Sequence, residues 1–419
     1  MQTTKNKIYL TTINDKSKIE VKCSNFISFL IGFSIFFIVF AWDGCFNLQV
    51  LFPLIAFILL WFLFRTNFHL IINDQFKIAL CIIIVYFISF VSNCILSIQI
   101  IGMSTLIRLA YSIIILLYYS VLVSLSYNKK QIKTLLLGNI CGGVFIAILI
   151  ILNFLNGAKG KISFNTVFGD AIEENYTGAI LSFELVLAFI LGVFNKKIYK
   201  KILLFAAVGV MFFGLCLTGS RAALIASVIS LMFFLIVYLF NSKIKFLNKI
   251  IFLSIIFIAV FFLFRYAEQI LPEFLYNRMF GNLVDGLVDS SNESRIALWK
   301  NALDGFLFRP FFGYGIGNFN YYVRQIWPQH TVVVAHNTYL DFLVDSGLIG
   351  LLLILIMLLS NIRSLFNKQG IFALSCLLSL LITSFIVGGE RTFFFWNGFI
   401  VLSIISKTMK QGIRLSEIL

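Results

Sequence analysis

Long apolar runs separated by short polar stretches dominate the chain. A membrane-spanning helix needs about 20 predominantly apolar residues, and runs of this kind recur from end to end. They are continuous rather than alternating, which argues against the strands of a β-barrel. The pattern predicts an all-α, polytopic integral membrane protein with about twelve transmembrane helices, at roughly 25–42, 46–64, 78–96, 103–125, 135–155, 176–194, 202–218, 222–240, 250–264, 338–360, 370–388 and 392–406.

These spans divide the chain into three parts, which are spans one to nine, a long loop, and the last three spans with a tail, at residues 1–264, 265–337 and 338–419. Within the long loop, Asn292–Leu307 predicts an amphipathic helix with Ile296, Leu303 and Phe306 on its apolar face. Such a helix can lie at the membrane interface. A shorter loop, Asn156–Tyr176, falls on the same side of the membrane as the long one.

Composition supports the membrane assignment. Hydrophobic residues make up 60% of the 419 residues, charged residues 12%, and Phe alone accounts for 49 positions. A water-soluble fold of this size needs more polar surface, and a disordered chain needs far fewer apolar residues. The seven cysteines show no CxxC spacing and lie mostly in apolar runs, so neither a metal site nor a disulfide framework is predicted.

The charge distribution predicts the orientation. In a soluble protein a formal charge of +15 would suggest nucleic acid, but in a membrane protein Lys and Arg collect on the cytoplasmic side. With a cytoplasmic N-terminus, the segments on that side hold 22 of the 33 Lys and Arg residues and only 4 of the 18 acids. An error of one span would scramble this alternation, so both termini are predicted to be cytoplasmic and both loops lie outside.

Charges on the outer side are the candidates for chemistry, because the topology rule gives no reason for them and charges at membrane depth are costly. They lie in short turns and at helix ends, and they are Arg108, Arg221, Arg295, His336, Glu390 and Arg391. The turn that holds Arg221 is too short for a mere anchor. Snorkelling anchors remain the interpretation for Arg265, Arg278 and Arg309, and His69 and His330 are interpreted as structural.

Polar residues also follow His336 into the next span. Asn337, Asp341 and Asp345 have i+4 spacing and share one helix face. They either orient the histidine or carry protons, or they join helices by hydrogen bonds. Gly313–Asn318 resembles a nucleotide-binding glycine loop, but no βαβ pattern precedes it. It is interpreted as a turn after Pro310.

The residue types in the outer cluster indicate a reaction. A guanidinium is always charged and grips phosphate at two points, so two or three arginines suit a diphosphate. A histidine of near-neutral pKa can take a proton from a sugar hydroxyl. Together they suit an anionic lipid-linked donor and a hydroxyl acceptor, with arginine rather than a metal stabilising the leaving diphosphate. Neither a cofactor nor a metal ion is predicted, since paired His/Cys spacing is absent.

The same residues carry a family resemblance. Between about 215 and 355 the sequence resembles the O-antigen ligase/polymerase superfamily of bacterial inner-membrane glycan transferases. The resemblance rests on three stretches, which are Gly219-Ser220-Arg221-Ala222; Ser294-Arg295 followed by Trp299-Lys300-Asn301-Ala302-Leu303 and Pro310–Phe319; and His336-Asn337 followed by Gly347-Leu348-Ile349-Gly350.

The resemblance implies a multi-pass enzyme of the bacterial inner membrane with a periplasmic active site. It would transfer a glycan whole from undecaprenyl diphosphate to an acceptor hydroxyl, without a metal. Arg221 and Arg295 would hold the diphosphate, and His336 would act as or near the base. Arg391, from the outer charges, is a third candidate for the diphosphate. Supporting roles would fall to Asn337, Asp341, Glu390 and Arg108. The implied partners are the lipid-linked glycan, an acceptor glycan or lipid A–core, membrane lipids and a chain-length regulator, with no nucleic acid.

Within the superfamily the motifs favour a polymerase, which joins repeat units on undecaprenyl diphosphate. The ligase motif often continues with two threonines after its second glycine, whereas Leu351 and Leu352 follow Gly350 here. Pro310–Phe319 also looks more like the polymerases. The alternative is an O-antigen ligase that attaches finished polymer to lipid A–core in lipopolysaccharide biosynthesis. A lipid-linked oligosaccharide flippase is more remote, because two similar halves and basic residues deep in several spans would be expected.

Overall fold

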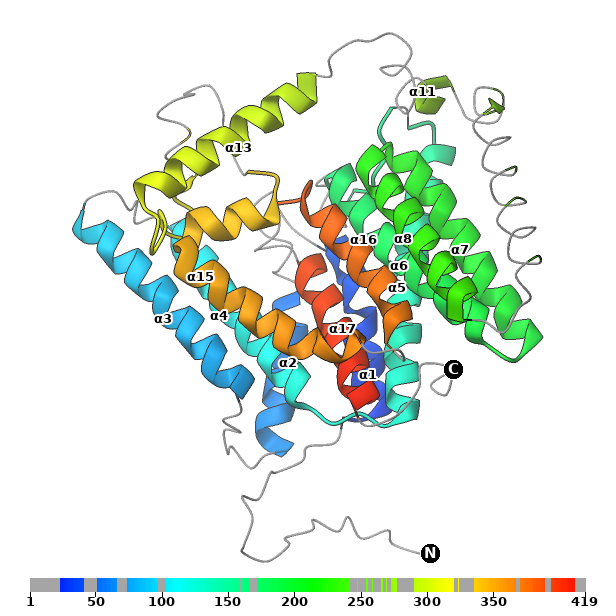
Figure 1. Cartoon of the computed structure of the whole chain (residues 1–419), viewed down its shortest axis with the longest axis horizontal. Coiled ribbons are helices and arrows are strands. Elements are labelled where there is room, and N and C mark those ends of the chain that lie inside the picture. Colours follow the sequence, from blue (N-terminus) through cyan, green and yellow to red (C-terminus); the bar gives the residue numbers. More distant parts are fainter. Residues whose placement is uncertain are drawn as a thin grey trace, which may run out of the picture.

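The computed structural model describes residues 23–40, 51–65, 74–96, 103–158, 160–165, 172–241, 265–266, 273–276, 290–319, 335–366, 370–388 and 393–410, with single positions 247, 254, 258, 269 and 323. Helices joined by turns make up this part of the chain, and it contains no β-strand (Figure 1). The all-α class predicted from the apolar runs is therefore confirmed.

The α-helices of two turns or more are α1 (Asn25–Phe33), α2 (Leu51–Arg65), α3 (Asp74–Ile95), α4 (Met103–Ser124), α5 (Lys129–Leu155), α6 (Glu174–Phe194), α7 (Ile198–Thr218), α8 (Arg221–Asn241), α13 (Ser290–Phe308), α15 (Thr338–Ile362), α16 (Leu374–Ser384) and α17 (Phe393–Lys410). Shorter elements are α11 (Glu273–Tyr276) and the 3-10 helices η1 (Ser34–Phe40), η3 (Arg363–Phe366) and η4 (Ile371–Ala373).

Seven helices of the described part are long and apolar enough to cross a membrane, namely α3 to α8 and α15 with η3. Shorter apolar helices lie in α1 with η1, in α2 and in η4 with α16. Most of the predicted spans thus coincide with a helix, and the chain is a multi-pass membrane protein. The ninth predicted span, residues 250–264, lies outside the described residues apart from Ser254 and Ile258.

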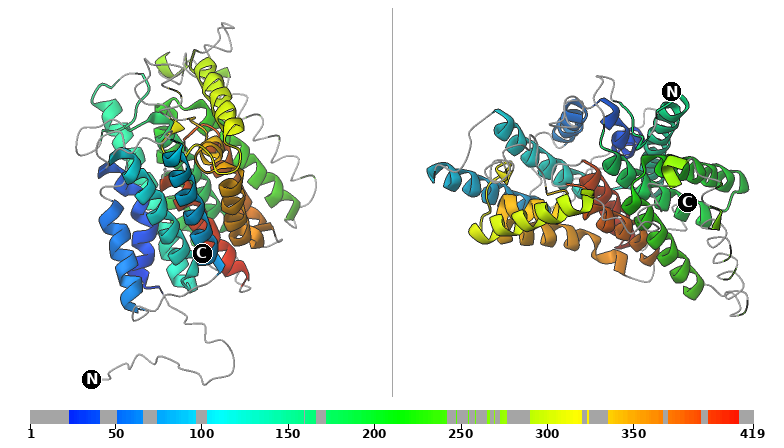
Figure 2. Two further views of the ribbon diagram at one scale, coloured as in Figure 1. Left: turned by 90° about the vertical axis from the view of Figure 1, so that its left-hand side faces the viewer. Right: turned by 90° about the horizontal axis from the view of Figure 1, so that it is seen from above.

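The helices pack into an elongated bundle, with α3 and the α7–α8 pair toward opposite sides (Figures 1 and 2). Helix α6 lies inside it and contacts α5, α7, α8 and α16. Every residue of α6 from Tyr176 to Ala188 is buried. A helix that is apolar all round needs such surroundings, and this position fixes where the two ends of α6 emerge.

One end of the bundle gathers the start of α1, the junction of α4 and α5, and the end of α17. Cys23 donates its backbone N–H to the carbonyl of Ser126 at 3.2 Å. Lys407 of α17 donates from Nζ to three carbonyls at the end of α4, those of Val123, Ser124 and Leu125, at 3.3, 3.2 and 2.8 Å. The last carbonyls of a helix lack intrahelical partners, and this lysine supplies them. We call this end the lysine end.

The opposite end gathers the start of α6, the turn between α7 and α8, and the start of α15. Helix α13 runs beside the first part of α15 (Figure 1). Both α13 and α15 carry residues that the sequence singled out. We call this end the site end.

Helix α15 is broken, which corrects the prediction of a continuous span over 338–360. Gly347 has φ 67° and ψ −170°, a conformation open almost only to glycine. The apolar pattern runs on through Leu348 to Leu353 and gives no sign of the break. Backbone groups on both sides of the break are nevertheless hydrogen-bonded, as buried backbone in a membrane requires.

The turn after Pro310 supplies those bonds. The N–H groups of Leu348 and Ile349 donate to the carbonyls of Pro310 and Phe311 at 2.8 and 3.3 Å. On the other side of the break, Tyr314 donates its N–H to the carbonyl of Val344 at 2.6 Å. The prediction of a turn here is confirmed, and this turn holds the two halves of α15 in place.

Candidate active site

The turn between α7 and α8 forms as predicted. Gly219 takes the left-handed conformation, with φ 62° and ψ 17°, and donates its N–H to the carbonyl of Cys216 at 3.0 Å. Glycine ends helices in this way because it lacks a Cβ. After Ser220, helix α8 begins at Arg221, which is half-buried. The stretch 202–240 is therefore two helices, and Arg221 lies at the first turn of the second.

Ser220 connects this turn to the start of α6. Its Oγ donates to Oδ1 of Asn175 at 3.1 Å. Asn175 in turn donates from Nδ2 to Oε1 of Glu173 at 3.1 Å. Glu173 occupies the N-cap position of α6 but makes no side-chain capping bond. Its carboxylate is thus engaged by Asn175 rather than by the backbone of its own helix.

His336 stands directly opposite this carboxylate. Its Nδ1 lies 3.7 Å from Oε1 of Glu173, with 31% of the histidine side chain and 42% of the glutamate side chain exposed. Nδ1 itself is buried and makes no hydrogen bond. The starts of α6 and α15 therefore bring an acid and a histidine face to face, a short movement from hydrogen-bond distance.

The backbone of His336 is strained. At φ 50° it is the one non-glycine residue with positive φ in the described part of the chain. Such conformations cost of order 1–3 kcal/mol, persist only where neighbours enforce them, and concentrate at functional sites. The backbone strain therefore indicates a functional role for His336 independently of the chemistry of its side chain.

Neighbours on both sides hold His336 in this conformation. Asn337 caps α15, since its Oδ1 accepts from the N–H groups of Tyr339 and Leu340 at 3.0 and 3.2 Å. Asp341 accepts from the N–H of Ala335 at 3.1 Å. Asn337 and Asp341 therefore fix the backbone around the histidine, while Asp345 is buried further along α15.

Helix α13 carries Arg295 and is attached to the same loop. Nε1 of Trp299, one turn after Arg295, donates to the carbonyl of Ala335 at 3.0 Å. Arg295 is half-buried. The helix packs on the protein through Leu298 and Ala302, while Ile296 and Leu303 of the predicted apolar face are 64% and 46% exposed. Amphipathic spacing predicted the helix but not which apolar face would contact the rest of the chain.

Other predicted residues take different positions. Arg108 donates from Nη1 to the carbonyl of Gly317 at 3.5 Å, so it contacts the turn that fills the break in α15. Glu390 and Arg391 lie outside the described residues, as do His69, Arg278 and His330. The described site thus consists of Glu173, Asn175, Ser220 and His336, with Arg221 adjoining.

Sequence reasoning missed Glu173 and Asn175. The available signal was Glu173-Glu174-Asn175, a pair of acids and an amide immediately before a span, on the side predicted to be the outer one. It also missed Glu184, which is 1% exposed in the middle of α6. A carboxyl group at that depth is costly, but among the described residues no contact links it to His336.

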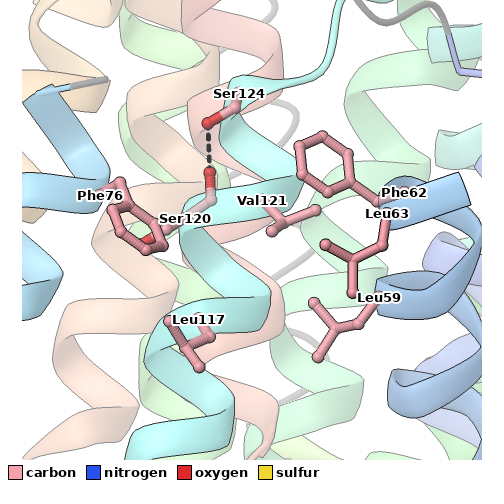
Figure 3. Close-up of a pocket in the computed structure, with 8 residues that line it drawn as sticks. All are labelled: Leu59, Phe62, Leu63, Phe76, Leu117, Ser120, Val121 and Ser124. Atoms are coloured by element: carbon pink, nitrogen blue, oxygen red, sulfur yellow. Dashed lines mark hydrogen bonds between the residues drawn. The ribbon is translucent and has the colours of Figure 1, made fainter. Parts of the chain in front are cut away.

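Two apolar pockets lie outside the polar cluster. The first, of about 160 Å³, opens between α2, α3 and α4 and is lined by Leu59, Phe62, Leu63, Phe76, Leu117, Ser120, Val121 and Ser124 (Figure 3). It lies toward the lysine end, where α4 finishes. The second, of about 130 Å³, runs along α15 between Tyr339 and Phe366 and is walled by α16 and α17. Its outer end is three residues from His336.

Helices able to cross a membrane, with acid, amide, histidine and arginine side chains at one end, define a multi-pass membrane protein with a polar site. Comparison with known families narrows the class. Residues 205–355 match the model of a family described as O-antigen ligase. The resemblance to the O-antigen ligase/polymerase superfamily is thereby confirmed for this segment, which contains Arg221, Arg295 and His336. The family indicates a glycosyltransferase-type membrane enzyme. No curated protein matches the chain.

Proposed function

We propose that this protein transfers a glycan en bloc from undecaprenyl diphosphate to an acceptor sugar hydroxyl, at the periplasmic face of a bacterial inner membrane. The observation that carries the proposal is the proximity of His336 to the turn that opens on Arg221, inside a segment matched by the O-antigen ligase family. The favoured reaction is the joining of O-antigen repeat units, as in a polymerase.

His336 serves as the general base. The acceptor hydroxyl oxygen attacks the anomeric carbon while its proton passes to Nε2 of the histidine. The bond between that carbon and the diphosphate oxygen breaks, and undecaprenyl diphosphate leaves with one more negative charge. The guanidinium groups of Arg221 and Arg295 stabilise this charge as it develops.

The position of Arg221 suits this role. It is the first residue of α8, where backbone N–H groups without helical partners and the helix dipole favour an anion. The guanidinium and the helix terminus would act on the same phosphate. Arg391, predicted from the sequence as a third cation, lies outside the described residues.

The lipid part of the donor needs an apolar surface next to the site. The pocket along α15 offers one, since it begins at Tyr339 and is lined by apolar and aromatic side chains down to Phe366. Burial of each CH₂ group contributes about 0.8 kcal/mol. A short part of the polyprenyl chain lying there, next to the headgroup, would present the diphosphate near His336 and Arg221.

The deciding experiment is a gel of lipopolysaccharide from a strain that lacks this gene, with lipid-linked glycans analysed beside it. Loss of a polymerase leaves a single repeat unit on the core. Loss of a ligase leaves a bare core while long glycan accumulates on undecaprenyl diphosphate, which would select the alternative reaction. An unchanged ladder together with unchanged lipid-linked glycans would overturn the proposal.

The proposed chemistry assigns charge stabilisation to arginine rather than to a metal ion. Transfer by purified enzyme should therefore continue at an unchanged rate in excess EDTA. Loss of activity that is restored by added Mg²⁺ would contradict this part of the proposal.

A further inference from the structure

We infer that Glu173 is a positioning residue for His336, and that Asn175 and Ser220 connect this pair to the Arg221 turn. The inference rests on the proposed function, because a positioning residue matters only if His336 is the base. It adds a residue that lies outside the matched segment 205–355.

The first step concerns the histidine tautomer. An imidazole accepts a proton at one nitrogen only if the other carries its hydrogen. Nδ1 of His336 is buried, makes no hydrogen bond, and faces Oε1 of Glu173 at 3.7 Å. A closing movement of about half an ångström would bring the pair to hydrogen-bond distance. With the proton held at Nδ1, the lone pair of Nε2 is available to the acceptor hydroxyl.

The second step concerns charge. When His336 takes the proton it becomes an imidazolium ion beside the carboxylate of Glu173. The negative carboxylate then lies 3.7 Å from the ring on which the positive charge has formed. Glu173 therefore stabilises the protonated base that forms during transfer, and it does so without contacting the substrate.

The third step concerns what holds the carboxylate. The same oxygen, Oε1, accepts from Nδ2 of Asn175 at 3.1 Å, and Asn175 accepts from Oγ of Ser220 at 3.1 Å. Ser220 is the neighbour of Arg221 in the chain. Two hydrogen bonds and the 3.7 Å contact between Glu173 and His336 thus link the base to the neighbour of the residue that binds the leaving group, and transfer depends on the relative position of these two groups.

A purely structural role for Glu173 is less consistent with its surroundings. Its side chain makes no capping bond to α6. It is 42% exposed, so it adds little to packing. Its carboxylate contacts the polar side chains of Asn175 and His336.

The test compares Glu173→Gln with Glu174→Gln in purified full-length enzyme. Glu174 is the matched control, because it is the next residue and also an acid. We expect Glu173→Gln to lower kcat by about 10- to 100-fold with KM within about twofold, since the carboxylate acts through the base and not on bound substrate. Glu174→Gln should stay within about twofold of wild type in both constants. Glu173→Asp keeps the charge and should recover part of kcat.

Combining variants separates this inference from the proposed function. If Glu173 acts through His336, then Glu173→Gln should cost nothing further in a His336→Ala background. Wild-type kcat in Glu173→Gln, or a loss that adds in full to that of His336→Ala, overturns the positioning role alone. Wild-type kcat in His336→Ala overturns the base assignment itself. If Glu173→Gln does not fold, Asn175→Ala carries the test, with a smaller fall in kcat expected and an unchanged kcat counting against the inference.

Discussion

At the lysine end of the bundle, Lys407 donates to three carbonyls of α4, and the Asn128 and Gln131 side chains complete a capping box at the start of α5. At the site end, His336 keeps a strained backbone and a buried Nδ1 without a hydrogen bond, and α15 breaks nine residues into its length. One end uses polar groups to complete the fold. The other also keeps a buried polar atom, Nδ1 of His336, without a hydrogen bond.

Both ends of the bundle carry charged residues, and the comparison of the two indicates which end holds the active site. Lys407 at the lysine end is explained by the helix terminus that it satisfies. His336 at the site end satisfies no helix terminus. Backbone strain together with a buried polar atom that lacks a hydrogen bond is typical of ligand-binding sites. Each prediction below tests whether the two ends of the bundle differ in this way.

Substitution of His336 should have the largest effect on activity. Removal of the imidazole in His336→Ala deletes the base, and we expect transfer to fall by roughly 1000-fold or more. The measurement is the rate of transfer by purified enzyme at matched amounts of inserted protein. Normal product at that amount would mean that the site end lacks the proposed base.

A second substitution at the same position sharpens the contrast. Glycine tolerates φ 50°, so His336→Gly should relieve the backbone strain and raise stability by up to about 1 kcal/mol while remaining inactive. Thermal unfolding in detergent, read beside the transfer rate, gives both quantities. A lower melting temperature than that of wild type would show that the histidine side chain stabilises the fold, contrary to the comparison.

The break in α15 should be the most sensitive point for folding. Gly347→Ala places a Cβ against the backbone of Phe311 and Phe312 and forces a conformation that alanine avoids, at a cost of about 3 kcal/mol or more. Loss of the folded, monodisperse fraction on size exclusion is the expected result. Gly209→Ala is the matched control, because a Cβ there meets nothing within 4 Å. Equal behaviour of the two variants would contradict the described packing.

How much of this could be predicted from sequence depends on whether the signal is local. The length of the apolar runs predicts most of the spans. Gly219-Ser220 predicts the turn between α7 and α8, because one glycine at the right spacing suffices to end a helix. His336 and Arg221 were selected because topology left them unexplained. The helix stop at Gly219 depends on residues within one turn, whereas the choice of His336 and Arg221 depends on the charge pattern along the whole chain.

The rest required tertiary contacts. Gly347 follows Asp345 and Ser346 and precedes an apolar run, a pattern that does not by itself predict a break. The turn after Pro310, bonded to the N–H groups of Leu348 and Ile349, stabilises the break. Glu173 lies far from His336 in sequence, and the burial of α6 within the bundle brings them together. For α13 the spacing of apolar residues predicted a helix, but two apolar faces were possible and the protein uses the one with Leu298 and Ala302.

Arg221→Lys should have an intermediate effect. Lysine retains the charge but contacts phosphate at one point, so we expect kcat to fall by about 10-fold or more while the protein folds normally. The control is Arg265→Lys, since Arg265 is exposed and interpreted as an anchor. Full activity of Arg221→Lys would place Arg221 in the same class as that control and leave the diphosphate without its proposed two-point ligand.

The smallest effect on activity is expected at the lysine end. Lys407→Met removes the donor to three carbonyls of α4, and those carbonyls must then be satisfied by water at the membrane surface. We expect a loss of about 1–2 kcal/mol in stability and an unchanged transfer rate per folded molecule. Lys410→Met, on the same helix but exposed at its last residue, should change neither. If Lys407→Met instead lowers the transfer rate while the melting temperature stays unchanged, the lysine end contributes to catalysis. The assignment of stability to one end and catalysis to the other would then be wrong.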